Sequence, residues 1–384
     1  MRDLLVGTHT PALGTGQAMR TYALARALAA AGDGLDLLYA RFGAELPDAS
    51  FLEIPGIELH EVHPSRRARR LLAYGAARLA GVPRDFARGV SPELARATSE
   101  LAATPGRGRV IADGPIAAAA QRRLARRRPG IYNAHNLESA FRHELSGSGV
   151  GSQSSLRAFE RGLLERASES WMVSEPDARG AHELCPSAPI RYVPNVIDVR
   201  QPEPTGSNVE GERVLMVADF SYEPNRNGLR FLLDDVMPLV WERLPGARLV
   251  VVGRGLEQSQ SEGSHTWDPR PWDPRVEALG FVADLDAVYA TSRCAAVPLL
   301  QGGGTPFKFI EALAHGLPVV ATPRAAAGLA VRDGEHYRAA STAAAFAQAL
   351  VELLRDGDDG LGARGWALAR ECYSIEALTE LLAA

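Results

Sequence analysis

The stretch GGGTPFKFIEAL, residues 302–313, carries the one lysine of this 384-residue chain. Lys and Arg together number 42, so every other basic residue is arginine. Lys308 stands in the first turn of a predicted helix, where the helix dipole disfavours a cation by about 0.3–1 kcal/mol. A bound anion reverses that preference, because the backbone N–H groups of a helix start bind phosphate oxygens and the ammonium adds a point charge. We therefore interpret this stretch as an anion site.

The residues around Lys308 mark both ends of the helix. Thr305 is a good N-cap, and Pro306 fits the first helical position. Gly316 followed by Pro318 is typical of a helix end. Apolar residues at helical spacing are predicted to form its buried face: Phe307, Ile310 and Ala314.

The glycines before the helix and an acidic residue within it extend the site. The N–H groups of Gly302, Gly303, Gly304 and Thr305 can cradle phosphate oxygens. Glu311, one turn after Lys308, can accept two hydrogen bonds from a vicinal diol such as a ribose. A diphosphate beside a ribose describes a nucleotide. The alternative is a surface Lys–Glu pair three residues apart, worth about 0.2–0.5 kcal/mol.

Composition limits the classes of function. The net charge is −4 and hydrophobic residues make up 46%, so the chain as a whole has no bias toward nucleic acid. The three cysteines are far apart and form no C-x-x-C pair, which favours neither a disulfide framework nor a zinc site and is typical of a reducing cytoplasm. The N-terminal apolar run is too short for a signal peptide, and we find no run of 18 apolar residues. We expect a cytoplasmic protein.

Short apolar runs alternate with amphipathic stretches along the chain, which predicts an α/β fold with parallel sheets. The predicted strands are DLLVG, LDLLYA, IELHEV, RVIADG, IYNAH, SWMVS and IRYVPN, then RVLMVADF, ARLVVVG, VEALGFV, AAVPLL and PVVAT. Predicted helices include residues 17–31, 116–127, 154–168 and 175–184.

The pattern restarts after a polar, Pro- and Gly-rich stretch at residues 200–213, which indicates a linker. We predict an N-terminal domain over 1–200, a C-terminal domain over 201–364 and a helical tail over 365–384. Residues 257–275 are predicted to be a surface insertion.

The sequence GGGTPFKFIEALAHGLPVVAT resembles the nucleotide-sugar motif of glycosyltransferase family 4, the retaining enzymes of the GT-B fold. The resemblance implies two doubly wound Rossmann-like domains facing across a cleft. It implies that Lys308 contacts the donor diphosphate, that Glu311 binds the ribose, and that both belong to the catalytic site. The family motif has a second glutamate eight positions before Glu311, and Gly303 stands there in this chain.

A glycine-rich turn follows the first predicted strand. Gly14 and Gly16 are followed by Met19 where a dinucleotide fingerprint needs a third glycine, so NAD binding is poorly supported. By resemblance, Gly16 lies near the donor phosphate and Gly14 near the acceptor. A tight turn that needs glycine only for its backbone is an equal alternative.

The segment YNAHNLES places polar residues at the carboxyl end of a predicted strand, which is the usual ligand edge of an open α/β sheet. The resemblance places His135 beside the transferred sugar, as a catalytic residue. Asn136 and Glu138 would then contact the acceptor. A packed or solvent-facing histidine, and a glutamate that caps the next segment, are the alternatives.

Two further loops of the second half are candidates for donor contacts. By resemblance, Arg226 in VADFSYEPNRNG is the basic residue near the diphosphate, and Phe281 and Val282 in GFV hold the base. Core packing is the alternative for Phe281. The basic stretches at 65–70 and 122–130 are typical of solvated helix faces; a peripheral contact with anionic lipid at the inner membrane surface is the other interpretation.

We therefore expect a glycosyltransferase that moves a sugar from a nucleotide-diphosphate sugar to an acceptor, with retention and without a metal or bound cofactor. The base is not fixed by the sequence, and UDP or GDP is expected. The acceptor is a glycan, a lipid-linked molecule or a small molecule, and no nucleic acid takes part. The alternatives are an inactive nucleotide-sugar binding protein, a sugar-nucleotide epimerase of the same fold, and a pyridoxal-phosphate phosphorylase, for which the chain is short.

Overall fold

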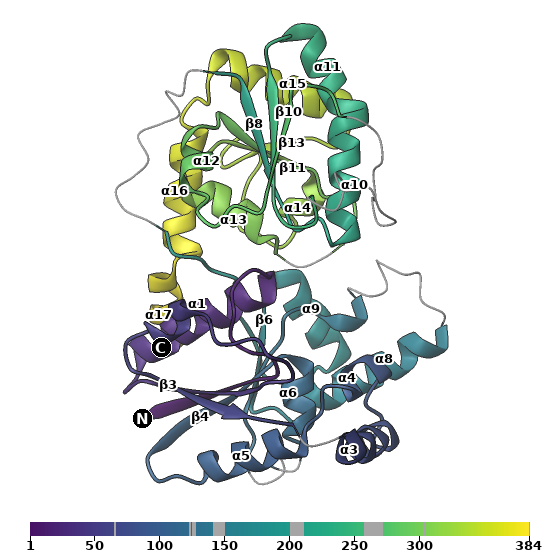
Figure 1. The fold of residues 1–384 in the computed structure, drawn as a ribbon, viewed down its shortest axis with the longest axis vertical. Coiled ribbons are helices and arrows are strands. Elements are labelled where there is room, and N and C mark those ends of the chain that lie inside the picture. Colours follow the sequence, from purple (N-terminus) through teal and green to yellow (C-terminus); the bar gives the residue numbers. More distant parts are fainter. Residues whose placement is uncertain are drawn as a thin grey trace. The chain divides into compact units, whose positions relative to one another are not determined.

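The structure is a computed structural model, and it describes residues 1–64, 67–122, 124, 128–140, 150–199, 211–256, 272–302 and 305–383. It divides into two compact units. Unit 1 comprises Met1–Asn195 with Ile375–Ala384, and unit 2 comprises Val196–Ser374. Figure 1 shows that each unit is a central sheet with helices packed against it. The predicted linker 200–213 and the predicted insertion 257–275 lie largely outside the described residues.

Unit 1 contains a seven-stranded sheet in the order β3-β2-β1-β4-β5-β6-β7. Every pair of neighbouring strands is parallel. The strands are β1 Arg2–Gly7, β2 Leu35–Ala40, β3 Ile57–Val62, β4 Arg107–Asp113, β5 Ile131–Asn133, β6 Glu169–Met172 and β7 Ile190–Tyr192. All seven predicted strands of the first half are confirmed. The strand order reverses between β1 and β4, and ligands bind at such a point in open α/β sheets.

The helices of unit 1 are α1 Gly16–Ala31, α2 Ala49–Leu52, α3 Arg67–Leu79, α4 Arg84–Ala87, α5 Pro92–Ala102, α6 Gly114–Ala120, α8 Val150–Leu164, α9 Glu175–Leu184 and α17 Ile375–Ala383. The prediction of a helix over 116–127 is wrong in its second half, because α6 ends at Ala120 and the described residues that follow form a turn. The helix predicted over 154–168 lies four residues earlier, and the other two predicted helices are confirmed.

Unit 2 contains a six-stranded sheet in the order β10-β9-β8-β11-β12-β13, again with parallel neighbours. Its strands are β8 Arg213–Val217, β9 Arg248–Val252, β10 Val276–Gly280, β11 Cys294–Val297, β12 Val319–Ala321 and β13 Arg338–Ala339. The sequence pattern missed β13, which has two residues and no apolar alternation. The order reverses between β8 and β11, at the second switch point.

The helices of unit 2 are α10 Glu223–Phe231, a π-helical turn η1 Leu232–Val236, α11 Met237–Arg243, α12 Asp286–Ala290, α13 Phe307–Ala314, α14 Pro323–Ala326, α15 Ala343–Asp356 and α16 Leu361–Cys372. Val214 and Met216 of β8 belong to one buried core, whereas Leu215 between them belongs to the other. Both faces of the sheet are therefore covered, which is why its strands are apolar at successive positions.

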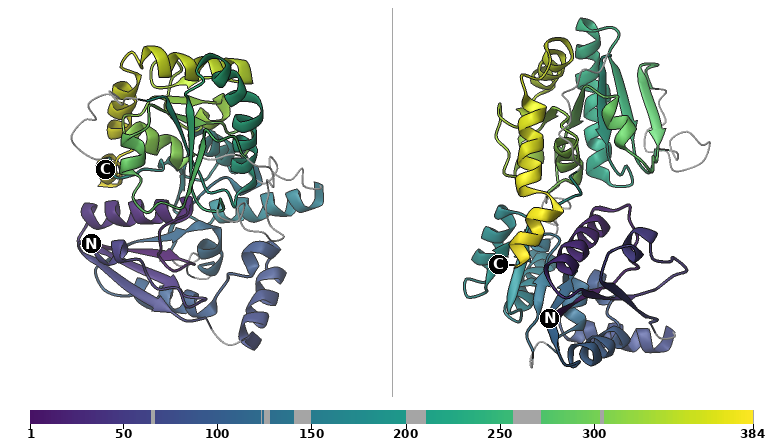
Figure 2. Two further views of the ribbon diagram at one scale, coloured as in Figure 1. Left: turned by 45° about the horizontal axis from the view of Figure 1, so that its top comes forward. Right: turned by 90° about the vertical axis from the view of Figure 1, so that its left-hand side faces the viewer.

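The C-terminal residues do not form one separate tail. Trp366 and Ala369 of α16 lie in a core of unit 2. Leu378 and Leu382 of α17 are buried in unit 1, where α17 packs against α1 and the backbone oxygen of Leu382 accepts a hydrogen bond of 3.0 Å from Arg109. The structure thus divides residues 365–384 between the units, and it moves the first boundary from 200/201 to 195/196. The views of Figure 2 show α16 and α17 following each other at the end of the chain.

No helix in the described part of the chain is both long enough and apolar enough to cross a bilayer.

Candidate functional site

Helix α13 begins one residue later than the sequence predicts. Its first residue is Phe307 and its N-cap is Pro306, which makes no side-chain cap. The prediction that Thr305 is the N-cap is wrong, because Pro306 has an extended backbone and Thr305 is buried before the helix starts. The amino end of α13 is therefore left without a side-chain cap, which leaves backbone donors at this end for a ligand.

The end of α13 follows the predicted signal. The N–H of Gly316 donates to the oxygen of Leu313, and the N–H of Leu317 donates to the oxygen of Ala312, as in a Schellman motif. Gly316 has the left-handed φ of 65° that this motif requires. The fully buried residues of the helix are Phe309, Ile310, Ala312, Leu313 and Ala314. The prediction for Phe307 is wrong: it is only half-buried, since the core lies under Phe309.

Lys308 is bound by a residue that the sequence analysis missed. Its Nζ donates to the side-chain oxygen of Asn225 at the start of α10, and Asn225 donates in turn to the backbone oxygen of Asp219 at 2.7 Å. No carboxylate among the described residues pairs with Lys308, so the surface Lys–Glu pair does not form. Burial lowers the pKa of Lys308 to about 8. A half-buried cation with only a neutral partner is suited to an anionic ligand.

The loop before α13 lies close to the loop after β8. Gly302 has a φ of 97°, and a Cβ there would lie 3.1 Å from the hydroxyl oxygen of Tyr222. The backbone conformation therefore favours glycine, and a Cβ would also crowd the Tyr222 hydroxyl. The oxygen of Gly302 accepts a hydrogen bond of 3.2 Å from Arg324, an exposed cation that the sequence analysis also missed. Gly303 and Gly304 lie outside the described residues.

Glu311 is held by an aromatic neighbour. Its Oε2 accepts a hydrogen bond of 3.1 Å from the hydroxyl of Tyr289 on α12. Burial raises the pKa of Glu311, although the Tyr289 hydrogen bond and the His315 charge oppose that rise. The side chains of Lys308 and Glu311 thus lie on one helix and have different hydrogen-bond partners.

Arg226 lies in the first turn of α10, next to Asn225, which contacts Lys308, but its guanidinium already has backbone partners. Nη1 donates to the oxygens of Phe220 at 3.1 Å and Ser221 at 2.9 Å. Its role in the structure is to close the β8–α10 loop. The start of α10 follows β8 at the β8–β11 switch point, so Arg226 stays a candidate by position.

The residues predicted to hold a base follow β10. Phe281 is 53% exposed, so the core-packing interpretation of this residue is wrong. The guanidinium of Arg254, which follows β9, lies 4.9 Å from the Phe281 ring centroid. Val282 is half-buried and packs against the core of unit 2. Phe281 and Arg254 together present an exposed flat surface at the carboxyl edge of the sheet, of the kind on which a base can stack.

In unit 1, His135 follows β5 and lies in a network that the sequence did not reveal. Nε2 of His135 is 2.7 Å from Oδ1 of Asp113, at the end of β4. Asp113 also accepts from Thr21 at 2.6 Å and Asn133 at 2.7 Å. Burial acts to raise the pKa of Asp113, but His135 and these hydrogen bonds outweigh it, and its pKa lies below the usual range. A charged Asp113 therefore orients the imidazole of His135.

The network continues to a buried arginine. Arg20 of α1 donates from Nη2 to Asn133 at 2.6 Å, and from Nη1 to the oxygens of Val193, Pro194 and the Asn195 side chain. Burial lowers the pKa of Arg20 to about 10. Arg20 thus ties α1 to the segment after β7. The position of Arg20 within a predicted helix gave no sign of this role.

The glycine-rich turn after β1 forms the start of α1. Thr15 is the N-cap and accepts from the N–H of Ala18 at 3.2 Å, so Gly16 is the first, exposed residue of the helix. Gly14 has a φ of 116°, which glycine favours. His9 lies beside this turn, and its pKa is lowered by burial and by the nearby charge of His135. The turn, His9 and His135 therefore share the β1–β4 switch point.

Asn136 is half-buried directly after His135, and the next segment is anchored by an acidic residue of α8. Glu160 accepts from the N–H of Glu138 at 2.7 Å and from the hydroxyl of Ser139 at 2.6 Å. Burial raises the pKa of Glu160 to about 7. Glu160 fixes the backbone that carries Asn136 and Glu138, which the sequence analysis missed.

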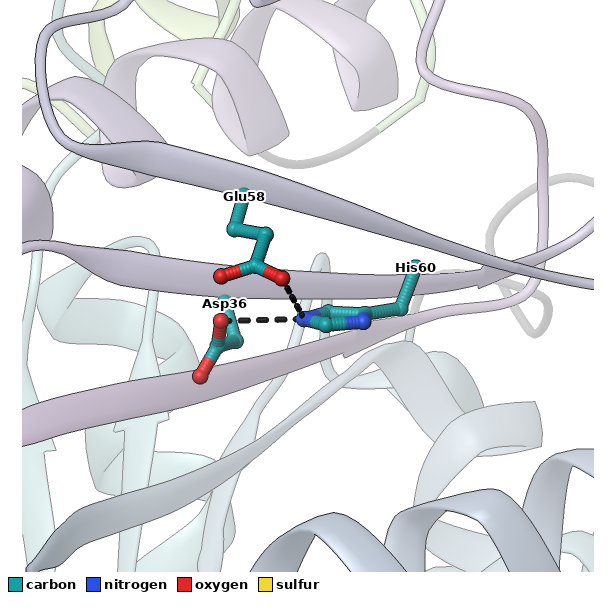
Figure 3. Close-up of side chains that lie close together, drawn as sticks. All are labelled: Asp36, Glu58 and His60. Atoms are coloured by element: carbon teal, nitrogen blue, oxygen red, sulfur yellow. Dashed lines mark hydrogen bonds and ion pairs between the residues drawn. The ribbon is translucent and has the colours of Figure 1, made fainter.

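One group of ligand-type side chains lies away from these sites. Asp36 of β2 and Glu58 and His60 of β3 converge in Figure 3, with Nε2 of His60 2.9 Å from Asp36 and 3.8 Å from Glu58. Asp36 also forms ion pairs with Arg2, at 3.0 Å, and with Arg107. Two guanidinium groups already neutralise this cluster, so we interpret it as an ion-pair network and assign no metal to it.

Solved structures share this architecture over the whole chain. Sucrose-phosphate synthase from Thermosynechococcus elongatus has a TM-score of 0.70 at 17% identity, over 100% of this chain and 97% of that one. HepE from Anabaena in complex with UDP-glucose has a TM-score of 0.66 at 15% identity, over 99% and 98%. The chain has the GT-B fold. At identities of 17% and 15%, these similarities establish the fold of the chain and nothing about its activity.

The matches found by sequence comparison cover only part of the chain. The family model described as Glycosyl transferases group 1 matches residues 211–356, which contain Asn225, Lys308 and Glu311. A phosphatidyl-myo-inositol mannosyltransferase from Mycobacterium leprae is 32% identical over 178 residues. That match spans 43% of this chain and 44% of the relative, so less than half of either protein is aligned.

Proposed function

We propose that the chain is a glycosyltransferase that moves a sugar from a nucleotide-diphosphate sugar to an acceptor. The observation that carries the proposal is the lysine at the uncapped start of α13, inside the region that matches Glycosyl transferases group 1. Lys308 has no anionic partner among the described residues, and it lies at the switch point of the unit 2 sheet. A diphosphate supplies the charge that this position lacks.

The donor contacts follow from the positions of the other residues in unit 2. Lys308 and the N–H groups from Gly302 to Thr305, with Gly303 and Gly304, bind the diphosphate and stabilise its charge as it leaves. Glu311 binds the ribose. Phe281 and Val282 hold the base, and Arg226 supports the phosphate loop. The structural relative HepE is described in complex with UDP-glucose and with UDP, which supports a UDP donor; GDP is the other base to test.

We further propose that transfer retains the anomeric configuration, as the resemblance to family 4 implies, and needs no metal. The helix start and Lys308 supply the positive charge that a divalent ion would otherwise give to the leaving diphosphate. His135, oriented by Asp113, contacts the transferred sugar in unit 1. Gly16 belongs to the donor side of that unit, and Gly14, Asn136 and Glu138 to the acceptor side.

The acceptor belongs to a class that the comparisons leave open: a glycan, a small molecule or a lipid-linked molecule. The name of the Mycobacterium leprae relative supports a lipid. The exposed side chains of helix α3 support binding of the chain to a membrane surface. Its exposed side chains combine large apolar and basic types: Leu71, Leu72, Leu79, Arg69, Arg70 and Arg78. A basic helix with exposed leucines binds anionic interfaces.

The second basic stretch reaches the same helix. Arg122 donates a hydrogen bond of 2.7 Å to the oxygen of Ala80, the residue after α3. Alanines of α3, namely Ala73, Ala76 and Ala77, line a groove of about 900 Å³ that α3 shares with α5 and α6. Both the charge and the unfilled apolar surface fit a peripheral contact with anionic lipid at the inner membrane surface.

Activity is tested by incubating the protein with UDP- and GDP-sugars, with and without acceptors, in the presence of EDTA. Release of nucleotide that depends on an acceptor, at least tenfold lower in Lys308→Ala and unchanged in the α10 control Arg230→Ala, supports the proposal. Donor binding without turnover identifies an inactive binding protein. Conversion of the donor without acceptor identifies an epimerase. Product NMR determines the anomeric configuration.

Membrane contact is tested by sedimentation with vesicles of phosphatidylglycerol and phosphatidylcholine. We expect binding that requires phosphatidylglycerol and is lost in Leu71→Glu with Leu72→Glu. The control is Leu52→Glu, which adds an acid at another exposed leucine, on α2. Equal binding of the two variants would contradict a role for α3.

A further inference from the structure

Tyr289 links α12 to the carboxylate that we assign to the ribose. Its side chain is 3% exposed, and its hydroxyl lies 3.1 Å from Oε2 of Glu311. Burial, together with the nearby carboxylate, raises the pKa of Tyr289 well above its usual value, so the phenol keeps its proton. Tyr289 is therefore a fixed hydrogen-bond donor, and Glu311 is the acceptor.

The ring of Tyr289 is fixed from one face by His315, the residue that caps α13. The two rings are stacked, with centroids 4.0 Å apart and planes 11° from parallel. Nδ1 of His315 is 2.8 Å from the backbone oxygen of Glu311, and Nε2 is 3.2 Å from the carboxylate of Asp286. Both ring nitrogens face oxygen acceptors; the neutral imidazole donates to one of them and the protonated imidazole to both. The tyrosine has little freedom to turn away from Glu311.

This arrangement makes the two oxygens of Glu311 unequal. Oε2 has a donor from the protein, whereas no donor from the described residues reaches Oε1. A flexible glutamate would lose rotamer freedom when it bound a hydroxyl, and that loss would weaken binding. A glutamate that Tyr289 already holds has less rotamer freedom to lose on binding, because its position is set before the ligand arrives.

We propose that Tyr289 is a positioning residue that holds Glu311 for a ribose hydroxyl and thereby sets a preference for ribonucleotides over nucleotides that lack these hydroxyls. This inference rests on the proposed function of the unit 2 site. In this proposal Tyr289 does not contact the ligand. Tyr289 affects nucleotide binding only through Glu311. The hydroxyl, and not the ring, carries the effect.

The test is isothermal titration of the full chain with UDP and GDP and with their 2′,3′-dideoxy forms. Tyr289→Phe keeps the ring and the His315 stack and removes only the donor. We expect about fivefold weaker binding of the ribonucleotide, which corresponds to one hydrogen bond, and less than twofold change for the dideoxy form. The matched control is Tyr337→Phe, a buried tyrosine of the same unit whose ring packs edge-on against Phe309 at 5.4 Å.

A second measurement separates positioning from a general loss of structure. In a Glu311→Ala background, Tyr289→Phe is expected to change ribonucleotide affinity less than twofold, because the residue it acts through is gone. Equal weakening of ribo- and dideoxynucleotides by Tyr289→Phe, or an undiminished effect in Glu311→Ala, would overturn the inference while leaving the donor site intact. If the parent protein binds none of the four nucleotides, the proposed function fails first, and the role of Tyr289 fails with it.

Discussion

Nζ of Lys308 donates a hydrogen bond to the side-chain oxygen of Asn225, a neutral partner that comes from 83 positions earlier in the chain. This contact joins the start of α13 to the start of α10 at the point where the sheet order of unit 2 reverses. An amide oxygen orients the ammonium but cannot neutralise it. The charge of the protonated lysine therefore remains available to a ligand.

Nucleotide affinity is expected to depend on the charge of Lys308. Its pKa is lowered to about 8, so above that pH the ammonium is progressively lost and with it the attraction for a diphosphate. We expect about tenfold weaker binding of the nucleotide at pH 9.5 than at pH 7.5, a range in which the diphosphate itself is fully ionised. Lys308→Arg, which stays charged, should bind with little change over this range. Titration at four pH values would show it.

The same group affects the free protein with the opposite sign. Between pH 8 and 10.5 the unfolded chain binds more protons at Lys308 than the folded chain does. The contribution of Lys308 to the free energy of unfolding therefore rises as pH increases through this window. For nucleotide binding, a decrease with pH in Lys308→Arg as steep as in the parent protein would contradict the assignment of this effect to the Lys308 charge.

Asn225→Asp is expected to disable the donor site without unfolding unit 2. A carboxylate beside Lys308 neutralises the ammonium, so nucleotide binding should weaken at least tenfold. The control is Asn227→Asp on the same helix, where the side chain accepts a hydrogen bond of 3.2 Å from Arg230 and a negative charge is tolerated. Calorimetric titration of both variants gives the comparison. Similar losses in the two would mean that net charge, and not the Lys308 contact, is responsible.

Glu160→Gln should change the pH dependence of stability. The pKa of Glu160 is raised from 4.5 to about 7, so the folded chain binds the proton more tightly than the unfolded chain. The free energy of unfolding then falls as pH increases from 4.5 to 7, by up to about 3 kcal/mol. The amide stays neutral, so the variant should lack this decline. Urea unfolding at pH 5 and pH 8 measures it, and an identical pH profile in parent and variant would exclude it.

Arg20→Lys tests the buried network of unit 1. A lysine has no planar fork and cannot donate to Asn133 and to the three acceptors after β7 together. The acceptors left without a donor should cost about 2–4 kcal/mol in the free energy of unfolding. Chemical denaturation is the measurement. A loss below about 0.5 kcal/mol would show that the network does not stabilise the unit.

Leu378→Ala tests the assignment of α17 to unit 1. Truncating a leucine that is 3% exposed should cost about 2–5 kcal/mol. Hydrogen exchange should then show lost protection in β1 and β4 while β8 and β9 keep theirs. The exposed neighbour Glu376, changed to Ala, is the control. Loss of protection in β8 instead would place α17 with unit 2.

The sequence by itself predicted twelve of the strands and indicated a candidate anion site at Lys308. Strands such as β9, β11 and β12 are apolar runs that are buried on both faces, so local composition predicts them. The site at Lys308 was visible because its parts are contiguous: glycines, a proline, a lysine and a glutamate within one loop and helix. A local pattern of this kind does not depend on distant contacts.

Only the tertiary structure decided which residues surround these groups. Asn225, Tyr289 and Asp113 reach Lys308, Glu311 and His135 because parallel strands bring their carboxyl ends to one edge, and no spacing along the chain records that convergence. The sequence likewise did not show which unit each of the C-terminal helices α16 and α17 packs against. Both are amphipathic, and an apolar stripe predicts burial without naming the core against which it packs.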